Sequence, residues 1–148
     1  MIQTSDVERA VRPLPEPDDD LVAQFWDHCR EGRLSFQRCS ACGRWRHLPR
    51  HRCAACGSPK WTWEESSGRG RIFSWTVTHQ PLVRGFPEAV PYAVVVVELE
   101  EGVRMVAGLR DLAPTVLELD LPVEVMFETA GERAKLPFFR PQKRGSRA

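Results

Sequence analysis

Two Cys-x-x-Cys pairs constrain this chain more than any other feature of its sequence. Cys39-Ser40-Ala41-Cys42 and Cys53-Ala54-Ala55-Cys56 are separated by ten residues, and a glycine follows each pair. Two residues between cysteines form a tight turn that aims both sulfurs at one point, and two such turns supply a tetrahedral set of four thiolates. Gly43 and Gly57 can take the positive φ that these turns need. The pattern predicts a zinc ribbon, with Cys39, Cys42, Cys53 and Cys56 as its metal ligands.

Other uses of these cysteines fit the sequence less well. The chain has 5 cysteines, so two disulfides would leave one unpaired, and residues 1–12 lack the apolar region of a secretory signal. A dithiol redox centre uses a single Cys-x-x-Cys near a βαβ pattern, and the sequence shows no such pattern. Four thiolates also leave no open position on the metal for catalysis. We therefore expect a structural zinc ion in a cytoplasmic protein.

Composition narrows the class of protein further. The 148 residues are 42% hydrophobic and 28% charged, which suits one ordinary domain or a small metal module joined to a small core. The longest apolar run, Ala93 to Val97, is far shorter than the roughly 20 residues that cross a bilayer. A net charge of +1 disfavours a protein whose main task is to coat nucleic acid.

The residues around the cysteines predict an arm, a helix and short strands. Residues 1–17 contain three spaced prolines and little periodicity, as a flexible arm does. The aspartates at 18–20 favour a helix N-terminus, and an amphipathic stripe follows until Gly32. The stripe consists of Leu21, Phe25, Trp26 and Cys29. Alternating residues at 34–38 and 61–63 predict strands that close the ribbon as a small antiparallel sheet.

From Gly68 onwards the sequence has the pattern of strands. Strands are predicted at 71–79, 92–99 and 103–109, with a last strand at 123–128 and a connection at 113–121 that suits a helical turn. Such strands favour a small Greek-key barrel of the OB type, with Phe73 and Trp75 packed inside it. The fold class is thus mainly β, with an N-terminal amphipathic helix, a four-cysteine zinc ribbon and an OB-fold barrel. The expected segments are a flexible arm at 1–17, the helix and its lead-in at 18–36, the ribbon at 37–65, the barrel at 66–141 and a basic, disordered tail at 142–148.

Arginines gather around the cysteine pairs, and the sequence leaves three interpretations open. Arg44, Arg46, Arg50 and Arg52 could offset the charge of about −2 on a four-thiolate zinc centre. They could instead bind the phosphates of coenzyme A, because guanidinium groups pair with phosphate oxygens. They could also bind single-stranded nucleic acid, which OB barrels with exposed aromatic side chains hold.

Two further segments are candidates for contact with a partner or an acyl chain. Phe86 lies beside Arg84 in a Gly-Pro loop, where an aromatic side chain has little core to join. Residues 136–140 form an apolar segment after the last predicted strand, and we expect it to dock on its own barrel or on another protein. The candidate contact residues are Arg44, Arg46, Arg84, Phe86, Phe138, Phe139 and Arg140.

The sequence contains no catalytic motif. It has no Gly-x-Ser-x-Gly elbow, phosphate-binding loop, Gly-x-Gly-x-x-Gly or His-Glu-x-x-His. His28 and Cys29 are adjacent on the predicted helix and point about 100° apart, so a buried cysteine is a better interpretation than a nucleophile with its base. His47 and His51 are expected to be solvated loop histidines, since four sulfurs already satisfy zinc. No catalytic residue is predicted.

Over residues 21–141 the chain resembles the OB-fold proteins with an N-terminal rubredoxin-like zinc ribbon, known as domain of unknown function thirty-five. The residues that carry the resemblance are Phe25-Trp26, Gly32-Arg33-Leu34, Gln37-Arg38-Cys39, Cys42-Gly43, Cys53, Cys56-Gly57-Ser58, 67–77, Pro91-Tyr92-Ala93-Val94, Val125-Met126-Phe127-Glu128 and 136–141. Ala54 stands where the family often has proline, and Asp120 stands where it often has glycine. The second departure affects the shape of the connection before the last predicted strand, and with it the choice of partner.

This resemblance implies a partner protein. Members of the family act beside enzymes of acyl-CoA metabolism, as accessory subunits or fused domains of thiolase-fold enzymes that include the retro-aldolases of steroid side-chain breakdown. The chain is therefore expected to be a non-catalytic accessory subunit in a hetero-oligomer, required by a partner lyase or acyltransferase, that supports complex formation and acyl-CoA binding or channelling. The alternative is a single-stranded nucleic-acid binding module, which the resemblance makes the weaker hypothesis.

Overall fold

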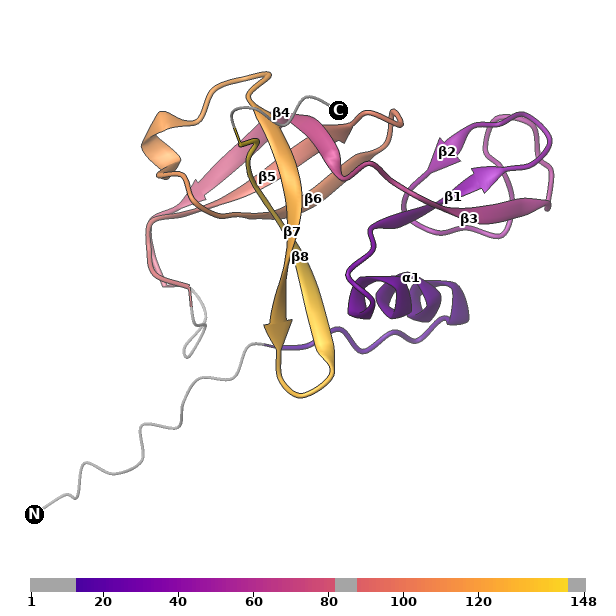
Figure 1. The fold of residues 1–148 in the computed structure, drawn as a ribbon, viewed down its shortest axis with the longest axis horizontal. Helices are drawn as coiled ribbons and strands as arrows, with labels where there is room; N and C mark the ends of the chain where they lie inside the picture. The colour runs from indigo at the N-terminus through magenta and orange to yellow at the C-terminus, as the bar shows by residue number, and fades with distance from the viewer. Residues whose placement is uncertain (1–12, 82–87, 144–148) are drawn as a thin grey trace, which may run out of the picture.

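A computed structural model describes residues 13–81 and 88–143 of the chain. It contains a three-stranded sheet, ordered β2-β1-β3, and a closed barrel, ordered β4-β5-β6-β8-β7, with a helix packed beside both (Figure 1). The elements are α1 (Asp20–Arg30), β1 (Ser35–Cys39), β2 (Trp45–Arg46), β3 (Trp61–Glu65), β4 (Arg69–Thr78), β5 (Tyr92–Leu99), β6 (Arg104–Leu109), the 3-10 turn η1 (Pro114–Val116), β7 (Pro122–Ala130) and β8 (Ala134–Pro141). In the part of the chain that is described, α1 is too short to cross a membrane. The predicted fold class, mainly β with a zinc ribbon and an OB-type barrel, is confirmed.

Helix α1 forms where the sequence predicts it. The carboxylate of Asp19 accepts hydrogen bonds from the backbone N–H groups of Leu21 at 2.7 Å and Val22 at 3.4 Å, which satisfies two free donors at the helix N-terminus. Leu21, Phe25 and Cys29 are buried along one face. The chain leaves the helix through Gly32, whose φ of +76° is accessible to glycine at little cost. The helix therefore presents an apolar stripe to the rest of the molecule.

The small sheet of the ribbon is antiparallel, as the sequence predicts. β1 pairs with β2 through Gln37 and Arg38, and with β3 along its whole length. One cysteine pair begins at the last residue of β1, and the other lies in the long connection between β2 and β3. The sheet consequently fixes the direction in which both cysteine turns leave it.

The barrel closes through its first strand. The ten residues of β4 pair with β7 near their start and with β5 along most of their length, so one strand reaches both neighbours. Gly70 lies in both pairings, and a Cβ atom there would overlap the carbonyl oxygen of Glu98. The remaining join is between β6 and β8, which run parallel and pair at only two positions. The helical turn predicted within 113–121 is present as η1.

Two predictions about the barrel are wrong. The predicted strand at 123–128 is followed by β8, so residues 136–140 belong to a further strand and not to a segment after the last one. Pro137 and Pro141 hide this strand in the sequence, because proline is rare in paired strands. Phe73 is 44% exposed and does not fill the barrel, because an irregularity between Ile72 and Ser74 shifts the two-residue alternation and turns Ile72 inward.

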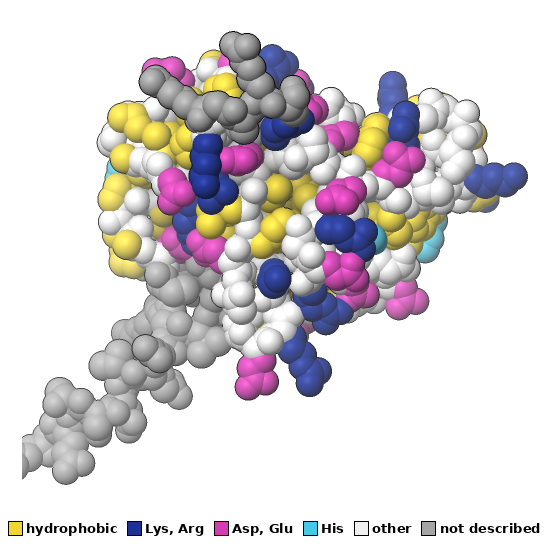
Figure 2. Space-filling view, viewed as in Figure 1, with side chains coloured by type: hydrophobic (Ala, Val, Ile, Leu, Met, Phe, Trp, Pro, Cys, Tyr) yellow, Lys and Arg dark blue, Asp and Glu magenta, His cyan; other side chains and the backbone are white. Residues whose placement is uncertain are grey.

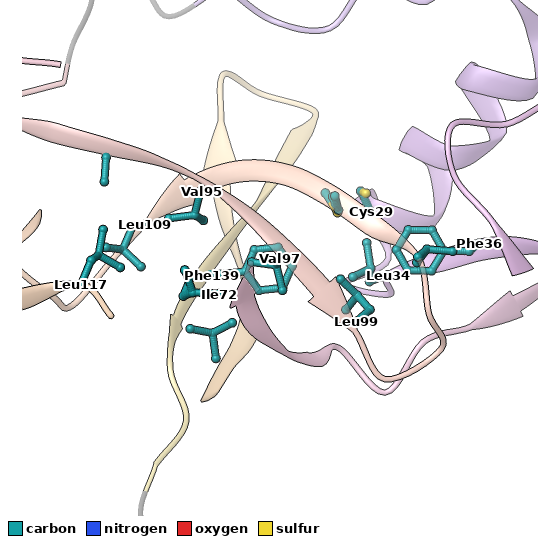
Figure 3. Packing of buried hydrophobic residues seen from close by; sticks show 14 of the residues in the cluster. Cys29, Leu34, Phe36, Ile72, Val95, Val97, Leu99, Leu109, Leu117 and Phe139 are labelled. Carbon is teal, nitrogen blue, oxygen red and sulfur yellow. The ribbon is translucent and has the colours of Figure 1, made fainter. Parts of the chain in front are cut away.

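A single core runs through the ribbon, the helix and the barrel. Figure 3 shows buried side chains in a continuous row from Phe36 and Cys29, past Leu99 and Phe139, to Leu117 at the far end of the barrel. The link between ribbon and barrel is also tied by polar contacts. The carboxylate of Glu101 accepts hydrogen bonds from the Ser66 hydroxyl at 2.9 Å and the Ser67 backbone N–H at 2.6 Å. The two parts therefore form one packed unit.

Candidate metal centre and contact surfaces

The four predicted ligands converge on one point. The Sγ atoms of Cys39, Cys42, Cys53 and Cys56 all lie within 4.8 Å of one another. Cys39 and Cys56, and likewise Cys42 and Cys53, are separated by 3.6 Å between sulfurs. A tetrahedral zinc ion with Zn–S bonds of about 2.3 Å requires sulfurs about 3.8 Å apart, and the two 3.6 Å separations are close to this value. The residues confirm a closed structural zinc site with four protein ligands.

Each cysteine pair forms the same turn. The backbone N–H of Gly43 donates to the carbonyl of Cys39 at 2.9 Å, and that of Gly57 donates to the carbonyl of Cys53 at 2.8 Å. Both glycines have a φ of +75°, which other residues adopt at a cost. The repeated geometry explains why both pairs end in glycine.

Backbone N–H groups inside these turns prepare the sulfurs for a cation. Those of Cys56 and Ala55 lower the pKa of Cys53 to about 6, and those of Cys42 and Ala41 lower the pKa of Cys39. The N–H of Ser58 acts in the same direction on Cys56, but the neighbouring cysteine sulfurs outweigh it and raise the pKa of Cys56 to about 11. Four sulfurs this close cannot all carry negative charge without a positive centre, which zinc supplies when it is bound.

Two arginines brace the cysteine turns from outside. Arg38 donates from Nε to the carbonyl of Gly43 at 2.9 Å, and Arg52 donates from Nη1 to the carbonyl of Gly57 at 3.0 Å. Each places its positive charge beside one turn, in keeping with the interpretation that arginines offset the charge of the thiolates. Arg38 precedes the first cysteine within a strand, and no local pattern predicts its contact with the turn.

The candidate contact residues occupy different environments. Arg44 is exposed next to the first cysteine turn, whereas Arg46 is directed inward, with hydrogen bonds from Nε to Oε1 of Gln37 at 2.8 Å and from Nη2 to the carbonyl of Arg50 at 2.7 Å. Arg140 forms an ion pair with Glu124 at 3.5 Å. Arg84 and Phe86 lie outside the described residues.

The aromatic candidates on β8 belong to the barrel. Phe139 is 0% exposed, so the expectation that its side chain contacts a partner is contradicted, and its packing in the barrel interior is the reason. Phe138 is also buried and lies 3.8 Å from the guanidinium of Arg110, which stacks over its ring. A strand that closes a barrel needs large inward side chains, and no pattern in the sequence indicates a strand over these residues.

Burial also shifts the pKa values of two side chains outside the metal site, those of Cys29 and His47. Cys29 is buried as expected, and desolvation raises its pKa to about 12, which makes it a poor nucleophile. His47 is not a solvated loop histidine. Its ring packs against Phe25 and Phe36 at centroid distances of 5.2 Å, and desolvation lowers its pKa to about 4. No local pattern signals this packing, because the three residues come from separate elements.

Comparison with known proteins places this architecture in a family. Residues 26–62 match the family described as "ChsH2, rubredoxin-like zinc ribbon domain", and residues 63–128 match "ChsH2, C-terminal OB-fold domain". A solved structure titled "Ltp2-ChsH2(DUF35) aldolase" contains a chain that is 36% identical. The two superpose with a TM-score of 0.78 over 85% of this chain and 98% of that one.

Three relatives illustrate the range of names in this group. A "Probable enoyl-CoA hydratase alpha subunit" of Thermomonospora curvata is 39% identical over 94% of this chain and 43% of its own length. The "3-oxo-4,17-pregnadiene-20-carboxyl-CoA hydratase alpha subunit" of Mycobacterium tuberculosis is 37% identical over 82% of this chain and 37% of its own length. A "DUF35 domain-containing scaffold protein" of Methanocaldococcus jannaschii is 31% identical over 77% of this chain and 82% of its own length. The chain thus spans about two fifths of the hydratase subunits but most of the scaffold protein.

Proposed function

The chain belongs to the DUF35 family of proteins, which join a ChsH2-type zinc ribbon to an OB-fold, and from this premise we propose that it is a non-catalytic accessory subunit of a thiolase-fold acyl-CoA enzyme. In this proposal the chain forms a hetero-oligomer with a thiolase or a retro-aldolase, as in steroid side-chain degradation. It supports assembly of the complex and the binding or channelling of acyl-CoA. Bond cleavage belongs to residues of the partner.

One observation carries the proposal. The related chain in the aldolase structure is matched over 98% of its length, so nearly all of the chain found in that complex has a counterpart here. The scaffold names of shorter relatives agree with a supporting role. The hydratase names belong to proteins of which this chain spans less than half, so hydratase activity is not assigned to it.

The described residues also suit a subunit that leaves chemistry to its partner. The four zinc ligands fill the coordination sphere of the metal, and the one remaining cysteine is buried with a raised pKa. Exposed Arg44 remains a candidate for a phosphate of coenzyme A, since guanidinium groups bind phosphate well. Arg46 and Arg140 are weaker candidates because each already contacts protein groups.

The surface of the barrel gives no support to the nucleic-acid alternative. On its outer face Arg71 and Arg104 both pair with Glu98, at 2.8 Å and 3.2 Å. Paired arginines offer less charge to a phosphate backbone than free ones. The one exposed aromatic on this face, Phe73 among the described residues, is covered by the guanidinium of Arg104 at 3.7 Å.

The test is reconstitution. The zinc-loaded chain and thiolase-fold enzymes encoded in the same genome would be purified separately, mixed, and assayed for complex formation by light scattering and for cleavage of acyl-CoA. We expect no turnover by the chain alone, turnover by the mixture above that of the partner, and loss of both zinc and complex in the Cys53→Ser variant. Acyl-CoA turnover by the chain alone, or the absence of any thiolase-fold partner, would overturn the proposal.

A further inference from the structure

A groove lies where the helix, the ribbon and the barrel meet. It has a volume of about 380 Å³ and is lined by α1, by the loop after β2, and by strands β6 and β8. In Figure 2 hydrophobic side chains reach the surface between the barrel and the ribbon, among charged side chains of both signs. The sequence does not reveal the groove, because its walls come from four segments that are far apart along the chain.

The groove opens where strands β6 and β8 close the barrel. β6 and β8 pair only at Gly108 with Phe138 and at Leu109 with Phe139, and they diverge on the groove side of this join. A Cβ atom on Gly108 would lie 2.7 Å from the ring of Phe138, so the close approach at the join depends on glycine. The fork between the diverging strands β6 and β8 is lined by the side chains of Met105, Val106, Leu136 and Pro137. The fork is therefore a fixed feature of the fold.

The ribbon supplies a rigid wall to the groove. Oε1 of Gln37, which is fully buried, accepts hydrogen bonds from Nε of Arg46 at 2.8 Å and from the backbone N–H of Arg50 at 2.7 Å. Arg46 in turn donates to the carbonyl of Arg50, so the two ends of the loop are tied together. His47 anchors the middle of the loop between two phenylalanine rings. A wall fixed in this way loses little conformational freedom when it binds a partner.

The chemistry of the lining selects an uncharged occupant. Among the described residues, no aspartate, glutamate, lysine or arginine lines the groove, and its histidine is neutral because desolvation lowers the pKa of His47 to about 4. Phosphate groups would find no positive charge here to replace water. The occupant that matches this surface is apolar and without charge.

The rim of the groove selects a protein over a small ligand. Leu48 on one side is 64% exposed and Val106 on the other side is 63% exposed. A site for a hydrocarbon ligand buries most of the ligand and of its own apolar lining, whereas these two side chains project outward. Only a broad apolar surface can cover both of them at once, as the centre of a protein interface does.

We propose that this groove receives an uncharged, apolar segment of the catalytic partner protein, with Leu48 and Val106 as the principal contacts at its rim. The inference rests on the proposed function, since it names the surface through which the accessory subunit binds its enzyme. It also assigns a role to the ribbon, which holds Leu48 in position for the partner.

The experiment compares three variants of the zinc-loaded chain in binding to the thiolase-fold partner identified by reconstitution. Leu48→Glu and Val106→Glu place a charge at the rim, and Leu119→Glu places one on an equally exposed leucine, at 65%, in the connection at the far end of the barrel. We expect each rim variant to raise the dissociation constant about tenfold or more and Leu119→Glu to change it by less than about twofold. Zinc content and melting temperature should be unchanged in all three.

The outcomes separate this inference from the function on which it rests. Wild-type affinity in both rim variants would overturn the groove while the accessory role stands, and so would weakening by Leu119→Glu alone. Failure of the wild-type chain to bind any thiolase-fold enzyme would overturn both. Shifts of the Met105 methyl resonance caused by hexanoyl-N-acetylcysteamine, an uncharged thioester, with no shift caused by the partner, would identify a ligand pocket and overturn protein docking. If a glutamate variant loses zinc, Leu48→Ala and Val106→Ala serve the same comparison.

Discussion

The packing of His47 predicts that the protein loses stability in mild acid. The imidazole lies between the rings of Phe25 and Phe36, and desolvation lowers its pKa from 6.5 to about 4. The folded state therefore keeps this group neutral at pH values where the unfolded chain binds a proton. Stability from the neutral ring is fully present above about pH 6.5 and is lost as the pH falls toward 4.

The size of the effect follows from the two pKa values. At about 1.4 kcal/mol for each tenfold difference in proton affinity, the loss approaches about 3 kcal/mol near pH 4 and amounts to about 1.4 kcal/mol at about pH 5.5. These values are upper limits, because part of the ring meets solvent. Even the smaller loss is a sizeable fraction of the stability of a typical domain, about 5–15 kcal/mol.

The measurement compares urea unfolding of the wild type and of His47→Phe, both loaded with zinc, between about pH 7.5 and pH 5.5. Phenylalanine keeps an aromatic ring in the same place and does not titrate, so acid effects on the zinc ligands are common to both proteins. The unfolding free energy of the wild type should fall relative to that of the variant by about 1 kcal/mol. A difference that stays constant over this range, or a His47 resonance that titrates near pH 6.5, would refute the reasoning.

Three other changes test the fold. Gly70→Ala should lower the unfolding free energy by about 1–3 kcal/mol or more, since its Cβ would overlap the backbone where β4 meets two strands. Gly102 has a φ of +87° but open space around it, so Gly102→Ala should lower the unfolding free energy by only about 1 kcal/mol. Phe139→Ala should cost about 3–5 kcal/mol by chemical denaturation and Phe73→Ala much less; equal losses would contradict the burial of the first and the exposure of the second. Removal of zinc by a chelator should abolish amide protection in the ribbon, as structural zinc contributes about 10 kcal/mol or more, and retained protection would show that the metal is dispensable.

The sequence predicts the metal site well because every determinant is local. Two-residue spacings and the glycines that follow them fix each turn, so the spacing alone is enough to assign the four cysteines from Cys39 to Cys56 as ligands. Helix α1 is local in the same sense, since Asp19 caps it and Gly32 ends it. The geometry of both elements is set by residues close together in the sequence and does not depend on distant parts of the chain.

What the sequence could not predict depends on contacts between distant residues. β8 contains two prolines, so its composition does not mark it as a strand, and it joins β6 at only two positions. Phe73 follows the alternation of β4 until an irregularity reverses the faces. His47 occupies an apolar site made by a helix and a strand that come earlier in the chain. In each case the tertiary neighbourhood overrides a correct local pattern.

The metal also fixes a loop whose shape depends on contacts between distant residues. The loop that carries His47 and Leu48 begins at one pair of zinc ligands and ends at the other, so the metal closes it as a loop of ten residues between Cys42 and Cys53. Gln37 and Arg46 then fix its shape, and Phe25 and Phe36 hold it against the helix. A short loop rich in charged residues would not maintain an exposed leucine beside an apolar groove without such restraints, because its conformational entropy opposes it. Loss of zinc should therefore weaken binding of the proposed partner even though no zinc ligand lines the groove.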